Sequence, residues 1–212
     1  MILMKRKIFL QIFNKASDNP SFSFIVCASF FIFGAVFGSI LSVYIDDPKY
    51  LYNFFSNFFM CFSAAGKISF WGTLFDFLRF LIIDLVLSVS AFGVIAIPAV
   101  AVFKGFLASF SVALIVRLFG FGGIPAAFAV SGIDILLFTP VFLCASSTAI
   151  KGSASLLKIC VGVQRSEAIF PQNIWVMFLF YVMFGVIIAG IEVISASWLC
   201  GGLIPDMFTG YI

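Results

Sequence analysis

The stretch that decides the fold is FSFIVCASFFIFGAVFGSILSVYI, residues 22–45, a run of 24 residues without a single charge. As an α-helix it would be about 36 Å long, enough to cross the roughly 30 Å hydrocarbon core of a bilayer with some tilt. Three more long apolar stretches follow it along the chain. The sequence therefore predicts a protein that is mostly embedded in a membrane, with the lipid bilayer as its first partner.

The composition supports this prediction. Of the 212 residues, 63% are hydrophobic and only 10% are charged, whereas soluble domains carry about 25% charged residues. The net charge of +3 is small and dispersed, which argues against binding to nucleic acid. The five cysteines form no CxxC pair, so we interpret them as buried small residues rather than disulfide partners or metal ligands.

We predict an all-α, polytopic bundle of five membrane spans, with residues 22–212 forming a single membrane domain. The spans are approximately residues 22–45, 77–102, 105–119, 124–150 and 174–199. Pro98 interrupts the second span, and the Gly-rich run 120–123 ends the short third one. Residues 50–65 are expected to be interfacial or re-entrant; a sixth span is the alternative there.

The basic residues indicate an orientation. Residues 1–21 alternate apolar and basic side chains, which is typical of a cytoplasmic amphipathic helix on the membrane surface. With five crossings and a cytoplasmic N-terminus, 8 Lys and Arg lie inside and 4 outside, which together are the 12 of the chain. The positive-inside rule thus favours a multi-pass cell-membrane protein with an extracytoplasmic C-terminus.

Five ionisable residues are expected at or near membrane depth, where charges are costly. Lys104 and Arg117 bracket the short third span and could extend their side chains to the two interfaces. Three acids cannot reach water in that way: Asp84, Asp134 and Glu192. Two interpretations stay open for these acids. They could form an ion or proton pathway, or they could pair with Lys104, Arg117 or neighbouring hydroxyls and hold the bundle together.

Small residues recur at helical spacing in two of the predicted spans. Gly34 and Gly38 form a GxxxG motif, and Gly105, Ser109 and Ala113 place a small residue at every fourth position. Such rows let helix backbones approach closely in lipid. We expect packing within the chain; self-association through Gly34 and Gly38 into a homo-oligomer is the alternative.

The sequence lacks the usual catalytic motifs. It has no histidine, which excludes a Ser-His dyad and an HExxH metalloprotease motif. There is no GxxxxGK[ST] phosphate loop, and no nucleophile has an evident base beside it. We therefore expect no enzyme activity, no cofactor and no metal, with a lipid-modifying enzyme of unfamiliar site as a weaker alternative.

The centre of the chain resembles the stage II sporulation protein M family. The resemblance rests on Lys104-Gly105-Phe106, on the run FGFGG at residues 119–123 and on an apolar span broken by Pro140. It covers approximately residues 77–150. Residues 131–134 read Ser-Gly-Ile-Asp, where family members often carry a proline with Asn or His.

The resemblance implies a non-enzymatic membrane scaffold. Such a scaffold would assemble peptidoglycan-remodelling hydrolases, stage II sporulation proteins D and P, at the septal and engulfing membrane during endospore formation. Small-residue helix faces and the outer segment 46–79 would then meet the partner proteins. The alternative function is a permease, either the membrane subunit of an ATP-driven exporter or an ion-coupled transporter that uses Asp84, Asp134 and Glu192.

Overall fold

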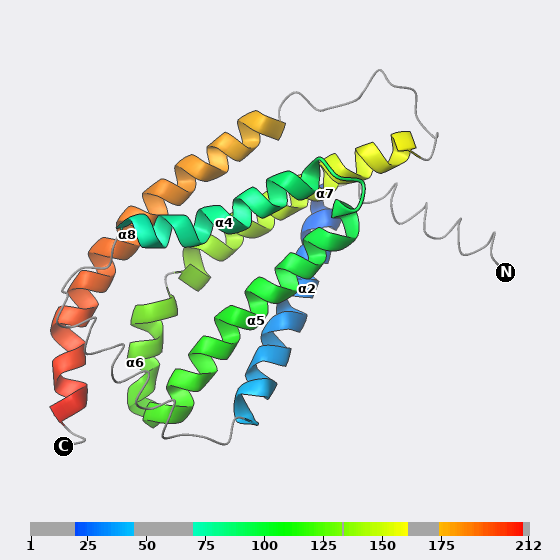
Figure 1. Cartoon of the computed structure of the whole chain (residues 1–212). Helices are drawn as coiled ribbons and strands as arrows, with labels where there is room; N and C mark the ends of the chain where they lie inside the picture. The colour runs from blue at the N-terminus through cyan, green and yellow to red at the C-terminus, as the bar shows by residue number, and fades with distance from the viewer. Residues whose placement is uncertain (1–19, 45–69, 133, 161–173, 210–212) are drawn as a thin grey trace.

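The computed structural model of the chain describes residues 20–44, 70–132, 134–160 and 174–209, and this part is all-α (Figure 1). The predicted amphipathic segment up to residue 19 and residues 50–65 lie outside the described residues. The α-helices of the described part are α2 (Pro20–Val43), α4 (Phe70–Ser88), α5 (Gly93–Phe119), α6 (Gly123–Ala127), α7 (Thr139–Cys160) and α8 (Ile174–Thr209). A 3-10 turn, η1 (Gly120–Gly122), precedes α6, and two π-helical segments, η2 (Phe128–Gly132) and η3 (Asp134–Phe138), lie between α6 and α7.

In the described part of the chain, four helical stretches are long and apolar enough to cross a membrane. They are Ser21–Val43, Gly93–Arg117, Asp134–Cys160 and Ile174–Ser195. The outward faces of α2 and α8 expose large apolar side chains such as Phe33 and Ile194, as expected of surfaces in contact with lipid. These features identify an all-α polytopic membrane protein. The helix α4 is not among the four stretches, because it carries three charged residues within 19.

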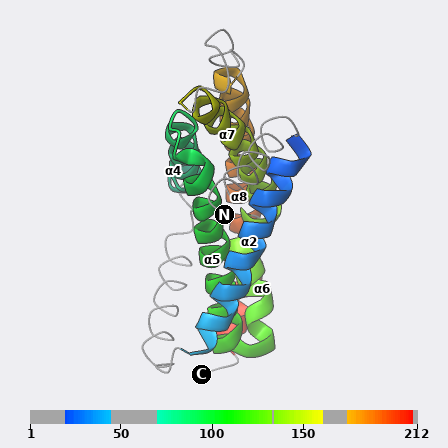
Figure 2. The same cartoon turned by 90° about the vertical axis from the view of Figure 1, so that its right-hand side faces the viewer.

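The directions of the long helices follow from their contacts. Helices α2 and α5 lie side by side and run the same way, as Figures 1 and 2 show. Ser39 of α2 contacts Ser109 of α5, and further along both helices Ser42 contacts Arg117. The chain between α2 and α5, which includes α4, therefore returns to the level at which α2 begins. Helix α7 runs back against α5, and α8 again runs in the direction of α5 (Figure 1).

The predicted boundary between the second and third spans was wrong. We expected spans 77–102 and 105–119, but α5 is continuous from Gly93 to Phe119. Pro98 lies in the second turn of α5, and such a proline is tolerated in a membrane helix because neighbouring groups compensate for the one lost backbone bond.

The chain turns instead at residues 89–92, where polar groups hold the backbone. The Phe92 N–H donates to Ser90 Oγ at 3.3 Å, and Ser153 Oγ of α7 donates to the Ser90 carbonyl at 2.5 Å. A Cβ at Gly93 would overlap the Leu87 carbonyl oxygen, so the turn needs glycine at this point. The turn is thus defined by serines and one glycine rather than by proline.

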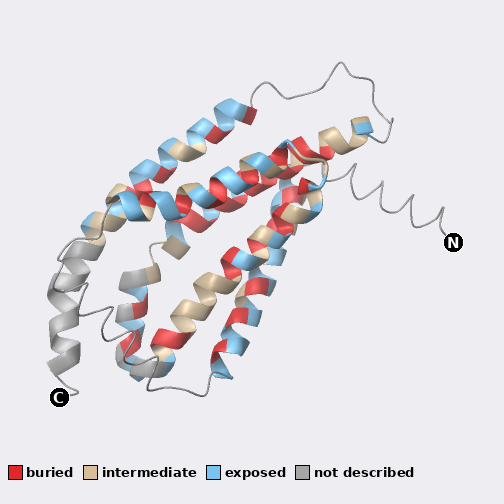
Figure 3. Cartoon of the chain, in the orientation of Figure 1, coloured by how far each residue is buried: buried red, intermediate tan, exposed pale blue. Residues whose placement is uncertain are grey.

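The predicted end of the fourth span, 124–150, was wrong. The described residues between 123 and 160 are helical, as α6, η2, η3 and α7, and α7 continues to Cys160. The predicted spans leave the polar residues after Ile150 in a connection, but Gly152 and Ser153 are buried inside the bundle. Figure 3 shows α7 as largely buried, and α7 contacts α2, α4, α5 and α8. Its small and hydroxyl side chains let four helices approach it.

The fifth span was expected at residues 174–199. The helix α8 begins at Ile174 as predicted and extends to Thr209, and its membrane-spanning stretch is Ile174–Ser195. A helix of 36 residues is about 54 Å long, which exceeds the roughly 30 Å hydrocarbon core. The end of α8 therefore projects beyond any span of ordinary length.

The contact between α2 and α5 is made by glycines. A Cβ at Gly34 would overlap the Val102 carbonyl oxygen, and one at Gly38 would lie 2.6 Å from the Phe106 carbonyl oxygen. From the opposite side, a Cβ at Gly105 would overlap the Phe31 backbone. We call the contact formed by Gly34, Gly38, Gly105, Ser39 and Ser109 the glycine seam. The GxxxG face is therefore occupied within the chain and is not free for self-association.

Candidate functional site

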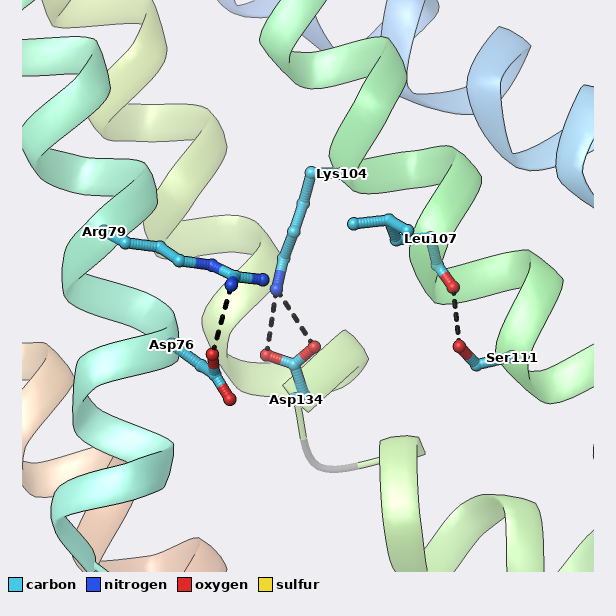
Figure 4. A network of polar contacts seen from close by, with 6 residues as sticks. All are labelled: Asp76, Arg79, Lys104, Leu107, Ser111 and Asp134. Carbon is cyan, nitrogen blue, oxygen red and sulfur yellow. Dashed lines mark hydrogen bonds and ion pairs between the residues drawn. The ribbon is translucent and has the colours of Figure 1, made fainter. Parts of the chain in front are cut away.

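A charged cavity lies on the other side of α5 from the glycine seam. Its volume is about 240 Å³, and α4, α5, α8 and the segments before α7 line it. Five charged side chains meet there: Asp76, Arg79, Lys104, Asp134 and Glu192. Figure 4 shows four of them, with Arg79 and Lys104 pointing toward Asp76 and Asp134. Charges at bilayer depth are rare and mark paths for ions or substrates.

The centre of the site is an ion pair between α5 and η3. Lys104 Nζ lies 3.1 Å from Asp134 Oδ2 and 3.3 Å from Asp134 Oδ1. Lys104 is only 8% exposed and lies near the middle of α5, so the expectation that it extends to the inner interface was wrong. Its ammonium nitrogen also lies 5.0 Å from the centre of the Phe80 ring, a cation–π distance.

Asp134 lies in a π-helical part of the chain rather than in a regular α-helix. It belongs to η3, and Ser131 of η2 lines the same cavity. π-Helical turns are rare and occur frequently at functional sites. The local geometry therefore distinguishes this part of the cavity wall from the α-helices around it.

A second, more open ion pair lies at the edge of the cavity. Arg79 Nη1 is 3.5 Å from Asp76 Oδ1, one turn away on α4, and both side chains are more than half exposed. The Arg79 guanidinium lies 5.0 Å from the Phe80 ring centre, so Phe80 contacts both cations of the site. From the sequence, Arg79 was expected in the outer segment 46–79, and Asp76 was not predicted as a site residue. The sequence signal that could have indicated this ion pair is the i, i+3 spacing of an acid and a base on a mostly apolar helix.

Glu192 supplies the third carboxylate from α8. The side chain is half-buried and lines the cavity, and its Oε2 has no hydrogen-bond partner within the described residues. Lys104 and Arg79 are each paired with another acid. The cavity therefore carries three carboxylates against two cations, and Glu192 is the acid whose charge the described side chains leave uncompensated. Such a site can accept a cation or a proton.

The other two predicted residues lie elsewhere. Arg117 Nη1 donates to the carbonyl oxygens of Ser42 at 2.7 Å and Val43 at 2.9 Å, so it caps the C-terminal end of α2. Asp84 is completely buried between α4 and α7, where it accepts a hydrogen bond from the Ser146 hydroxyl. Of the three acids that we grouped as a pathway, the structure brings Asp134 and Glu192 together and sets Asp84 apart.

The predicted packing residues are separate from the cavity. Gly34, Gly38, Gly105 and Ser109 belong to the glycine seam, where the two serine hydroxyls, Ser39 Oγ and Ser109 Oγ, are 2.5 Å apart. Ala113, the last residue of the predicted row, is half-buried on α5. Within the described residues, no group of three or more Cys, Asp or Glu side chains could hold a metal ion.

Comparison with known proteins adds no identity. No model of a protein family matches the chain. No curated protein sequence and no solved structure matches it significantly.

Proposed function

We propose that this chain is a membrane transport protein whose charged cavity binds a coupling ion or a small charged solute. The observation that supports this proposal is the Lys104–Asp134 ion pair in a charged cavity, beside the uncompensated Glu192. A purely structural ion pair needs neither a cavity around it nor a third acid. A binding site needs both, because the ligand must enter and must find a charge to pair with.

The helix directions agree with five passages through the membrane. Because α2 and α5 run the same way, the chain between them must cross back if both span the bilayer, and among the described residues α4 is the helix available for that return. With Arg79 and Lys104 assigned to the cavity, seven basic residues remain on the N-terminal side and three on the other. The positive-inside rule then places the N-terminus in the cytoplasm and the C-terminus outside.

The test is electrogenic transport by the purified full-length chain in proteoliposomes. Capacitive currents would be recorded on a solid-supported membrane while proton, sodium or small organic ammonium gradients are applied in turn. We expect a current with at least one of these cations, and we expect Glu192→Gln and Asp134→Asn to abolish it.

The matched control is Ser195→Ala, one turn from Glu192 on α8 and outside the cavity, which should keep the wild-type current. Wild-type currents in both cavity variants would refute the proposal. So would the absence of a current for every cation in folded, reconstituted wild-type protein.

The resemblance to stage II sporulation protein M supports a second proposal, a scaffold for peptidoglycan hydrolases that performs no chemistry itself. Because the glycine seam is filled by the chain's own helices, partners would have to contact the outward apolar faces of α2 and α8. The test is cross-linking and mild-detergent purification of a C-terminally tagged copy from its native host. Recovery of peptidoglycan hydrolases would support the scaffold, and recovery of an ATPase would support an exporter subunit.

A further inference from the structure

Asp84 is a fully buried acid that the charged cavity does not include. Its exposed fraction is 0%, and it does not line the cavity. One carboxyl oxygen, Oδ2, accepts a hydrogen bond from Ser146 Oγ, and the other, Oδ1, has no partner in the described part of the chain. Burying an ionised carboxylate with one neutral donor is strongly unfavourable, so such a group needs a counter-ion or a proton.

The groups around Asp84 supply no counter-ion. Helix α2 presents the buried thiol of Cys27, which lies within electrostatic reach of Asp84, and α7 presents the Ser146 hydroxyl. The cation of α5, Lys104, is paired with Asp134, and on α4 itself Arg79 is paired at the open edge of the cavity. Among the described side chains of α8, the ionisable groups are engaged elsewhere: Glu192 lines the cavity, and the Tyr181 hydroxyl meets Thr148 at 3.1 Å.

A metal ion does not fit this position. Calcium and magnesium ions take about six or more oxygen ligands, whereas Asp84 has one hydroxyl neighbour. Within the described residues, no group of three or more Cys, Asp or Glu side chains could hold a metal ion. A proton needs no such shell, and it removes the charge that burial disfavours.

Four phenylalanines lie along the helices between the charged residues of the cavity and the Asp84–Ser146 contact. Phe77 and Phe80 stand between Asp76 and Asp84 on α4, and Phe138 and Phe142 stand between Asp134 and Ser146 from η3 into α7. Phe77 stacks on Phe138 with ring centres 4.4 Å apart, and Phe80 meets Phe142 edge to face at 6.1 Å. All four are at most 5% exposed. On α4 and on α7 alike, a ring of this layer is followed four residues later by a polar group, Asp84 after Phe80 and Ser146 after Phe142. The aromatic layer, defined by these four rings, thus separates the acid from the charged side chains below it.

We propose that Asp84 is a proton-binding site, which holds its proton in the resting protein and is sealed from the charged cavity by the aromatic layer. The carboxyl group is neutral, and its hydroxyl or carbonyl oxygen pairs with Ser146. Access to the site requires the rings of the layer to move apart. The site is distinct from the cavity and does not depend on which ion or solute the cavity takes.

The test is infrared spectroscopy of the full-length protein in lipid at neutral pH, where a protonated carboxyl gives a C=O band separate from that of carboxylates. We expect such a band from Asp84 in the wild type, and we expect Asp84→Asn to remove it. In Ser146→Ala the band should persist at a shifted frequency, because the acid stays and loses its hydrogen bond. Glu192→Gln is the matched acid-to-amide control and should leave the Asp84 band in place.

Transfer to D₂O then tests the aromatic layer. The band should exchange slowly in the wild type and faster in Phe138→Ala, which opens the layer. Phe121→Ala, at a ring that is 92% exposed, should exchange as slowly as the wild type. A missing band in the wild type, or a band that neither Asp84→Asn nor Ser146→Ala affects, would overturn the proton site. If Asp84→Asn does not fold, Ser146→Ala still tests the site. Rejection of the Asp84 proton site would leave the transport test of the cavity unaffected.

Discussion

The two sides of α5 differ in kind: one packs tightly against α2, and the other lines a charged cavity. Gly105 lies in the glycine seam, where two helix backbones touch and no side chain fits between them. Lys104, its neighbour in sequence, points to the other side and meets Asp134 in a cavity of about 240 Å³. The seam gains stability from close backbone approach, whereas the cavity keeps charges apart from lipid and leaves one acid uncompensated.

This contrast shows that one helix can carry a rigid packing contact on one face and a charged cavity on the opposite face. A tight seam fixes α5 against α2, so the position of Lys104 in the cavity is set by a contact on the far side. Variants on the two faces should therefore differ in kind: those in the seam should cost stability, and those in the cavity should also change function.

The largest effect is expected for Gly34→Ala in the seam. The added Cβ would overlap the Val102 carbonyl oxygen, which is backbone and cannot rotate away. The apparent free energy of unfolding should fall by about 3 kcal/mol or more, the upper end of overpacking costs. Unfolding by SDS in mixed detergent micelles measures this loss.

Gly190→Ala is the matched control, because no atom lies within 4 Å of a Cβ at that position in α8. It should leave the unfolding curve unchanged. An equal loss in both variants would show that glycine content, and not the seam, decides the stability.

Lys104→Met should have the next largest effect. It leaves Asp134 without its partner, and the loss should be about 2 kcal/mol, below the value for fully buried pairs because the Asp134 side chain is 30% exposed. Lys104→Met combined with Asp134→Asn should recover most of this loss in the same unfolding assay. A double variant as unstable as the single one would show that Lys104 acts through packing on Phe80 rather than through the ion pair.

Arg117→Ala should cost about 1 kcal/mol, because it removes the two hydrogen bonds that cap the end of α2. Arg117→Lys should recover part of the loss, since an ammonium can still bind carbonyl oxygens. The two unfolding free energies compare the cap directly; equal losses would mean that the cap requires a guanidinium and that an ammonium cannot replace it.

The smallest effect is expected for Ser39→Ala, which removes the hydroxyl contact with Ser109 across the seam. Hydrogen bonds between membrane helices contribute about 0.6 kcal/mol on average, and the loss should be of that size. A double-mutant cycle with Ser109→Ala gives the coupling between the two hydroxyls. A coupling of zero would show that the glycines alone hold the seam.

The sequence predicted the features that depend on local pattern. The uncharged run 22–45 became α2, and the spacing of Gly34 and Gly38 matched a helix contact. The Gly-rich run after Phe119 ended α5 as expected, with Gly120 at a positive φ of 59°.

The features that depend on tertiary partners could not be predicted in this way. Lys104 looked like the end of a span because a charge normally marks an interface, and only the partner 30 residues later, Asp134, keeps it inside. Residues after Ile150 looked like a connection because Ser153 and its neighbours are polar, yet Ser153 is buried against the turn at Ser90. The sequence could not show that Asp134 lines the charged cavity and that Asp84 does not, because local spacing does not reveal which groups a helix face contacts in the folded bundle.

The modest hydropathy of α4 has a consequence for how the protein is made. This helix carries Asp76, Arg79 and Asp84 within 19 residues, which is unfavourable for insertion into lipid as an isolated segment. The hydroxyl that donates to Asp84 belongs to Ser146 of α7, which leaves the ribosome 62 residues after Asp84. We therefore expect helix α4 to take its final place only after α7 has been synthesised, so that the placement of an earlier helix depends on a later one.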